Sequence, residues 1–414
     1  MKDKKQNKRI NGGHRLLFFC ILCLFGLYVA VSYAGEQTQR EQSKTKVILL
    51  HTDNLTYDQY RHPGAQILTG NVQFQHDGVL MYCDSACFYE ATNSFDAFGH
   101  VKMVQGDTLD LVGDMLLYNG LDQLARVRHN VVLTHRESKL YTDSLDYDRL
   151  YELGYFFEGG RLVDKDNVLT SDWGQYSPPT RQAVFNYNVK LENPKFTLIS
   201  DTLNYNTQTS MAEIVGPSNI DSGDNHIYSE SGFYNTQTEE AILLDRSIVT
   251  NKGRKMVGDS LYYDSKSGVG EGFRNVVYTD EVNKNMLTGN YCYYNDSTGY
   301  SMATDSAVAI DYSQRDTMYM HADTFKVYTF YMDTDSMYRE VRGYHKVRSY
   351  RMDVQSVCDS LVFDSRDTCI TMYRDPIVWN GGQQVLGEVI KVYLNDSTID
   401  RIHVIDQTLS VERI

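Results

Sequence analysis

The chain has 414 residues, of which 42% are hydrophobic and 23% are charged; this composition is typical of a folded protein and excludes a disordered one. Its net charge of −14 opposes binding to nucleic acids and to anionic membrane surfaces. Tyrosine is frequent, with 32 residues against 2 tryptophans, and its ring suits pleated, half-buried strands.

The beginning of the chain has the pattern of a secretory signal peptide. A basic stretch is followed by an apolar run from Leu16 to Val31, and Ser32-Tyr33-Ala34 supplies the small residues that signal peptidase accepts. We predict a cleaved signal peptide over residues 1–34, a linker over 35–46, and an exported mature protein. The alternative is an uncleaved membrane anchor. The first 34 residues carry six basic residues and one acidic residue, so their removal lowers the net charge from −14 to −19.

One pattern recurs after the linker: an acidic or amide residue, an apolar or small residue two positions later, and usually an aromatic residue four positions later. Between Asp84 and Asp259 successive copies lie 29 or 30 residues apart, which indicates an internal repeat. The copies are Asp53-Leu55-Tyr57, Asp84-Ala86-Phe88, Asp114-Leu116-Tyr118, Asp143-Leu145-Tyr147, Asp172-Gly174-Tyr176, Asp201-Leu203-Tyr205, Glu230-Gly232-Tyr234, Asp259-Leu261-Tyr263 and Asn290-Cys292-Tyr294, with looser copies at Asp323, Asp359 and Glu388.

A second recurring element, a polar residue before a β-branched one, lies between these copies. Examples are Asn71-Val72, His100-Val101 and Asn130-Val131. Both elements alternate with period 2, so both predict strands with one buried face. We expect the acidic residue at the exposed start of its strand, the aromatic residues as a ladder inside the stack, and a turn at the Asp or Asn that follows the aromatic residue.

Each 29-residue unit is therefore predicted to form two strands and two turns. A unit of this size cannot bury its own apolar face, so neighbouring units must stack and share a core. The fold class is all-β, and periodicity alone leaves an antiparallel jellyroll and a parallel β-helix solenoid open.

The cysteines predict neither a disulfide framework nor a metal site. Five remain after cleavage, an odd and sparse set: Cys83, Cys87, Cys292, Cys358 and Cys369. Cys358 and Cys369 flank a predicted turn and could pair across a hairpin. No histidine lies at a ligand spacing near these thiols, and we expect no metal and no cofactor.

The order of the motifs resembles the OstA/LptA-like family of periplasmic lipopolysaccharide-transport proteins. The resemblance rests on Gly70-Asn71-Val72, on Phe98-Gly99-His100-Val101, on the stretch from Leu111 to Tyr118, and on the stretch from Val257 to Tyr263. It covers residues 47–300, the predicted OstA/LptA-like domain. Residues 301–414 are predicted as a degenerate continuation of the repeat array.

The resemblance implies an elongated, repeat-built β-jellyroll of antiparallel strands, open along one side as a V-shaped groove. Lipid A acyl chains of lipopolysaccharide would lie in the groove. Other lipopolysaccharide-transport jellyroll proteins would pair edge to edge with the terminal strands, and a homo-oligomer is possible. The implied location is the periplasm, or the inner membrane facing the periplasm if the leader stays uncleaved. The expected function is a periplasmic lipopolysaccharide bridge or chaperone.

Residues of the two alternating patterns are the predicted lining of this groove, because apolar surface is what acyl chains bury against. The sequence does not determine which face opens. The predicted lipid-binding residues are Leu55, Tyr57, Val72, Phe74, Val101, Met103, Leu116, Tyr118, Leu145, Tyr147, Leu203, Tyr205, Leu261 and Tyr263.

We weigh two other functions against lipid transport. A polysaccharide-degrading enzyme needs a site that breaks the repeat once, whereas the carboxylates here recur in register with it. We find no catalytic motif and predict no enzyme. A structural or adhesive repeat protein is the second alternative. The basic interval of Arg339, Arg342, Lys346, Arg348 and Arg351 is either a solvated strand face or a contact for lipid phosphates or an acidic partner.

Overall fold

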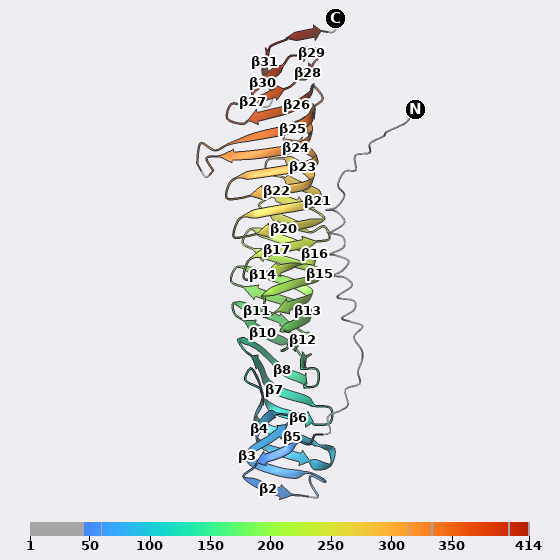
Figure 1. The fold of residues 1–414 in the computed structure, drawn as a ribbon, viewed down its shortest axis with the longest axis vertical. Helices are drawn as coiled ribbons and strands as arrows, with labels where there is room; N and C mark the ends of the chain where they lie inside the picture. The colour runs from blue at the N-terminus through green and yellow to red at the C-terminus, as the bar shows by residue number, and fades with distance from the viewer. Residues whose placement is uncertain (1–44, 59, 314, 333, 396–397, 413–414) are drawn as a thin grey trace, which may run out of the picture. The chain divides into compact units, whose positions relative to one another are not determined.

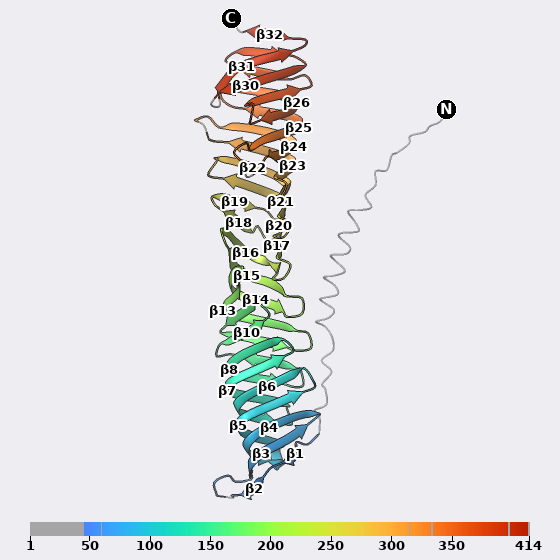
Figure 2. The ribbon, with the colours of Figure 1, turned by 90° about the vertical axis from the view of Figure 1, so that its left-hand side faces the viewer.

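The computed structural model describes residues 45–412 except 59, 314, 333, 396 and 397. The predicted signal peptide and nearly all of the linker lie outside the described residues. Within the described part of the chain, no helix is long and apolar enough to cross a membrane. The described strands form one sheet of 32 strands (Figures 1 and 2). In several places two short strands lie along one longer neighbour, as β9 and β10 do along β8.

The strands of the first half are β1 Ile48–His51, β2 Asn54–Tyr57, β3 Gln66–His76, β4 Val79–Tyr89, β5 Ser94–Gln105, β6 Leu109–Asn119, β7 Leu124–His135, β8 Ser138–Asp148, β9 Leu153–Phe156, β10 Gly160–Asp164, β11 Asn167–Ser171, β12 Trp173–Ser177, β13 Gln182–Asn193, β14 Phe196–Asn206 and β15 Met211–Ser222. A short 3-10 helix, Glu90–Thr92, joins β4 to β5.

The strands of the second half are β16 Asn225–Asn235, β17 Glu240–Leu244, β18 Ile248–Asn251, β19 Arg254–Val257, β20 Ser260–Asp264, β21 Val269–Asp280, β22 Asn285–Asn295, β23 Tyr300–Asp311, β24 Met318–Phe330, β25 Tyr338–Tyr350, β26 Val354–Asp364, β27 Cys369–Tyr373, β28 Ile377–Asn380, β29 Gln383–Leu386, β30 Val389–Asn395, β31 Thr398–Ile405 and β32 Leu409–Glu412.

Neighbouring strands pair antiparallel, as in β5 with β6 and β22 with β23. This confirms the antiparallel jellyroll and excludes the parallel solenoid. The physical reason is the turn length, because a connection of two to four residues can join only antiparallel neighbours. The predicted turns are also confirmed: β6 ends at Asn119 and β14 at Asn206, and each side chain accepts a hydrogen bond from a backbone N–H two residues later.

In eight of the twelve copies the repeated polar residue lies at a bend within a strand, not at the strand start that we predicted. In the other four it comes directly before a strand, as predicted: Asp53, Asp172, Asp259 and Glu388. Asp114 interrupts the pairing of β6 with β7, where His129 and Asn130 both have positive φ and form a bulge. The Asn130 amide donates to the Asp114 carboxylate at 2.6 Å, and Asn188 and Asp172 repeat the contact at 2.6 Å. A polar residue in the pattern therefore marks a bend through which the sheet continues.

The bends divide the sheet into two arms. The first arm holds the strand halves with the repeated aromatic residues, such as 85–89 and 115–119. The second arm holds the halves with the repeated β-branched residues, such as 72–76 and 101–105. Apolar side chains on the facing sides of the arms form the core, where the Phe74 and Phe95 rings stack with centroids 4.1 Å apart. We call these facing sides the inner face.

The pairing suggested for Cys358 and Cys369 is wrong. The five cysteines of the described chain are free. In the β26–β27 hairpin, Cys369 lies opposite Asp364, and Cys358 lies opposite Val347 of β25. The turn begins immediately after Asp364, so Cys358 is too far along the strand to meet Cys369.

Candidate functional site: the inner face between the arms

The strand register places one continuous row of side chains on the inner face of the second arm. In its first part each side chain is at most 2% exposed, and the residues are Phe74, Met81, Met103, Leu111, Leu133, Leu140, Leu162, Leu169, Leu191, Leu198 and Ile220. The same row continues through partly exposed side chains, namely Ile227, Val249, Met256, Tyr278, Leu287, Ala309, Met320 and Ser349. Burial therefore changes at β16.

A row on the first arm, near the free ends of the arms, changes at the same level. Tyr118, Tyr147, Tyr176 and Tyr205 are fully buried and alternate with small residues such as Ala125. Tyr234 and Tyr263 are partly exposed, and Tyr294 in the same row is 42% exposed. We call residues 66–222 the sealed section and residues 225–350 the open section.

Side-chain volume varies along a deep row of the first arm. Deep in the sealed section the first arm contributes Phe156, Phe185 and Leu203 to one row. The continuation of that row in the open section includes Gly272, Ala303 and Gly343. The row also holds Gly174 in the sealed section and Leu243, Leu261 and Phe325 in the open section, so small and large residues alternate along it in both.

Polar contacts join the free ends of the two arms across the sealed section. Four buried tyrosine hydroxyls each meet a side chain of the second arm that lies 41 or 42 residues earlier in the sequence. The pairs are Tyr118 with His76 at 2.7 Å, Tyr147 with Gln105 at 3.5 Å, Tyr176 with His135 at 2.7 Å and Tyr205 with Asp164 at 2.7 Å. We call this set the seam. These hydroxyls are buried because the opposite arm covers them.

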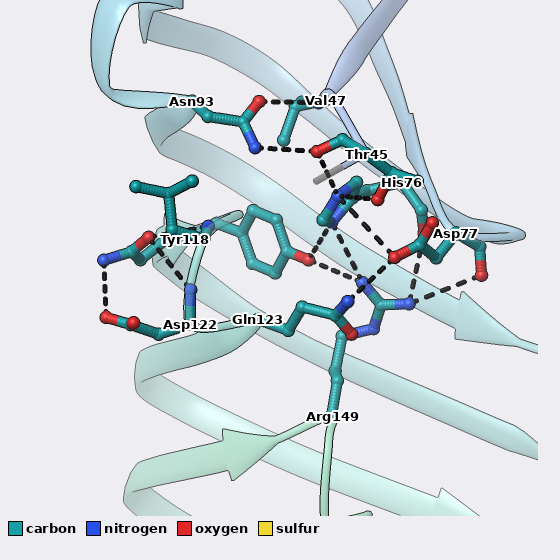
Figure 3. Close-up of polar contacts among 11 residues, drawn as sticks. Thr45, Val47, His76, Asp77, Asn93, Tyr118, Asp122, Gln123 and Arg149 are labelled. Atoms are coloured by element: carbon teal, nitrogen blue, oxygen red, sulfur yellow. Dashed lines mark hydrogen bonds and ion pairs between the residues drawn. The ribbon is translucent and has the colours of Figure 1, made fainter. Parts of the chain in front are cut away.

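The first pair belongs to a buried cluster around Arg149 (Figure 3). Arg149 donates to the Tyr118 oxygen at 2.5 Å and to the His76 carbonyl at 3.1 Å. Because the Tyr118 oxygen accepts from Arg149, its hydroxyl can donate to Nδ1 of His76, and Nε2 of His76 then faces the Thr45 carbonyl at 3.2 Å. Gln123 of the first arm also donates to Asp77 at 2.8 Å. The two arms are therefore held together by hydrogen bonds at this level.

The seam ends near the boundary of the two sections. Asp164 accepts from Ser138 and Tyr205, both at 2.7 Å, and Asn167 donates to Tyr205 and Thr236, both at 2.9 Å. Toward the C-terminus, the last polar side-chain contact between the arms among the described residues is the ion pair of Lys195 with Glu239.

Two seam histidines make the sealed section sensitive to acid. Burial lowers the pKa of His76 below its usual value of 6.5, and the charge of Arg149 lowers it further, although Asp77 and the Thr45 carbonyl act in the opposite direction. Burial and the charges of Arg136 and Arg181 lower the pKa of His135. Both histidines are therefore harder to protonate in the folded protein than in the unfolded chain.

We expect the free energy of unfolding to be highest above pH 6.5 and to fall as the pH drops below it, because the unfolded chain then binds protons that the folded chain excludes. Urea unfolding at pH 7.5 and 5.5 measures the loss. His76→Gln should reduce the acid sensitivity, whereas His226→Gln, at a more exposed site, should not. An equal loss in both variants would contradict the assignment.

The fourteen predicted lipid-binding residues all lie on inner-face rows, but in different environments. Eleven are buried, at 3% exposure or less: Val72, Phe74, Val101, Met103, Leu116, Tyr118, Leu145, Tyr147, Leu203, Tyr205 and Leu261. Leu55 and Tyr57 on the terminal strand β2 are 53% and 60% exposed, and Tyr263 is partly exposed. The partly exposed apolar row of the open section was not among the predicted residues.

The seam was also missed from the sequence, although a pattern for it exists. The second-arm partners His76, Gln105, His135 and Asp164 are polar residues at strand ends, 29 or 30 residues apart. Such residues look like ordinary turn residues until the opposite arm is known.

The fold and its inner face define a repeat-built, two-armed antiparallel β-jellyroll. The family model described as an OstA-like protein matches residues 44–201 and 197–259, more than half of the chain. The chain belongs to the OstA-like family. Membership supports, in general, a role related to lipopolysaccharide transport. The OstA-like family is a family of periplasmic transport and binding proteins and not a family of enzymes. No curated protein sequence matches the chain.

Proposed function

We propose that this protein is a periplasmic lipid-binding bridge or chaperone of lipopolysaccharide transport, and that lipid A acyl chains lie on the inner face of its open section. The observation that carries the proposal is the change of burial along a single second-arm row, from Ile220 at 2% exposure to the partly exposed Ile227. An acyl chain on that row removes apolar surface from water, at about 0.8 kcal/mol for each buried CH₂ group.

The chemistry of the open row favours a flexible apolar ligand. Met256, Leu287 and Met320 remain partly exposed. They pack against the buried core of the open section, which includes Val276 and Phe325. Methionine is unbranched and polarisable, so it adapts to ligands of irregular shape. Of the residues first predicted, Tyr263 is a partly exposed residue of the open section, while the buried ones of the sealed section need the seam to open before a lipid can reach them.

The ends of the sheet support partners that add strands. β2 pairs with β3 and β32 with β29, and the described residues place no further strand beyond either one. Ile48, Leu55 and Leu409 at these ends are each at least 53% exposed. Unpaired edges with apolar side chains favour edge-to-edge pairing with another jellyroll, either a transport partner or a second copy.

A pair of methionines in one row provides the test. Photoreactive residues are placed at Met320 in the open section and at Met103 in the sealed section, in protein expressed in cells that make lipopolysaccharide. We expect a lipopolysaccharide adduct at position 320 and none at position 103 after irradiation. Absence of an adduct at 320, in protein that circular dichroism shows to be folded, would overturn the proposal.

A further inference from the structure

The open stretch of the inner face is closed at both ends. On one side the second-arm row is buried at Ile220, at 2% exposure. On the other side it is buried again at Ser356 and Val378, at 3% and 1%, and Val392 on the first arm is 4% exposed. The eight partly exposed residues between these ends lie on eight neighbouring strands, which span about 34 Å at the usual strand spacing.

One guanidinium lies at the free ends of the arms over this stretch. Arg339 of β25 has the same strand parity as Val341 and Gly343, so its side chain starts on the inner side. Among the described residues no carboxylate lies within ion-pairing distance of it. Two other arginines at the free ends of the arms are paired, since Arg254 lies 3.3 Å from Asp280 and Arg351 2.6 Å from Asp353.

Arg339 also faces the other arm. Its charge, together with that of Arg254, acts to lower the pKa of the Tyr278 phenol, against the larger effect of burial, which raises it. Tyr278 belongs to the partly exposed second-arm row. A cation of the first arm and a phenol of the second therefore lie on either side of the same opening.

We propose that the open section is a bounded site for a single-headed anionic amphiphile, with its acyl chain along the second-arm row and a phosphate head at Arg339. This rests on the proposed function in its chaperone form and adds two points to it: the cargo is held between closed ends, and its head is recognised by charge. A guanidinium binds phosphate through two parallel hydrogen bonds, which gives orientation as well as attraction.

The surroundings make this charge selective. The chain carries a net charge of −14, so an anion meets repulsion over most of the surface. Arg339 has no ion-pair partner among the described residues and lies beside an apolar row. A molecule with one anionic head and one apolar tail therefore gains from both the charge and the apolar surface.

Two probes with the same acyl chain test the head. Lysophosphatidic acid carries a phosphate, monoacylglycerol carries none, and both bear a diazirine at the chain end. The full chain as exported should bind lysophosphatidic acid more tightly, and Arg339→Gln should weaken that binding about tenfold without changing monoacylglycerol binding. Arg348→Gln is the matched control, because Arg348 is exposed on the same strand and has the opposite parity.

The diazirine tests the bounded ends. After irradiation, labelled peptides should come from residues 225–350. Labels on inner-face residues of 66–222, or of 354–394, would overturn the bounded site. Equal affinity for the two probes, or an Arg339→Gln variant that binds as the native chain does, would overturn the head site while a lipopolysaccharide adduct at position 320 keeps the proposed function. Absence of any bound probe and of that adduct would overturn both.

Discussion

Arginine at position 103 is expected to unfold the surrounding strands, whereas arginine at position 320 should leave the protein folded and abolish lipid binding. Met103 is 1% exposed between the arms, so Met103→Arg buries a charge without a partner, at a cost of about 3 kcal/mol or more. Met320 lies in the same row and is partly exposed, so the new guanidinium reaches water and blocks the apolar row.

The two variants control for each other, because residue type, row and substitution are identical. Hydrogen exchange measures local stability around β3–β7 and around β23–β25, which suits a repeat protein whose units interact mainly with their neighbours. Lipid binding is measured by the adduct at Leu287, two strands away from Met320. If both variants lost protection equally, the division into sealed and open sections would be wrong.

Removing one hydroxyl from the seam should destabilise the sealed section. Tyr205 donates to the buried Asp164 at 2.7 Å and accepts from Asn167 at 2.9 Å. Tyr205→Phe leaves both groups short of a hydrogen bond inside the protein, which costs about 2 kcal/mol. Urea unfolding followed by tyrosine fluorescence and by hydrogen exchange at β10–β16 measures this loss.

Tyr294→Phe is the matched control for this experiment. Tyr294 occupies the same first-arm row, but it is 42% exposed and its hydroxyl has no cross-arm partner among the described residues. Its change should stay within about 0.5 kcal/mol, as is usual at exposed positions. A loss at Tyr294 as large as that at Tyr205 would show that the ring, and not the cross-arm hydrogen bond, matters.

The strands and their ends follow from local chemistry, which is why the repeat was sufficient to predict them. Alternation defines the buried side of a strand, and Asn119 or Asn206 ends it by bonding its own backbone. The bend was missed because Asp114 and Asn130 lie 16 residues apart in the sequence, and their hydrogen bond joins two neighbouring strands, β6 and β7, each of which extends beyond the element that the pattern predicts.

The sequence by itself determined the all-β repeat, the inward set of apolar residues and the family. Only the tertiary structure decided which part of the inner face is accessible. Leu203 and Leu287 have the same alternation, yet the first is buried and the second partly exposed. The reason is that exposure depends on the side chains of the opposite arm. Contacts between the arms, such as the hydrogen bond of Tyr205 with Asp164, join residues about 41 positions apart. Strand periodicity carries no information about that facing partner.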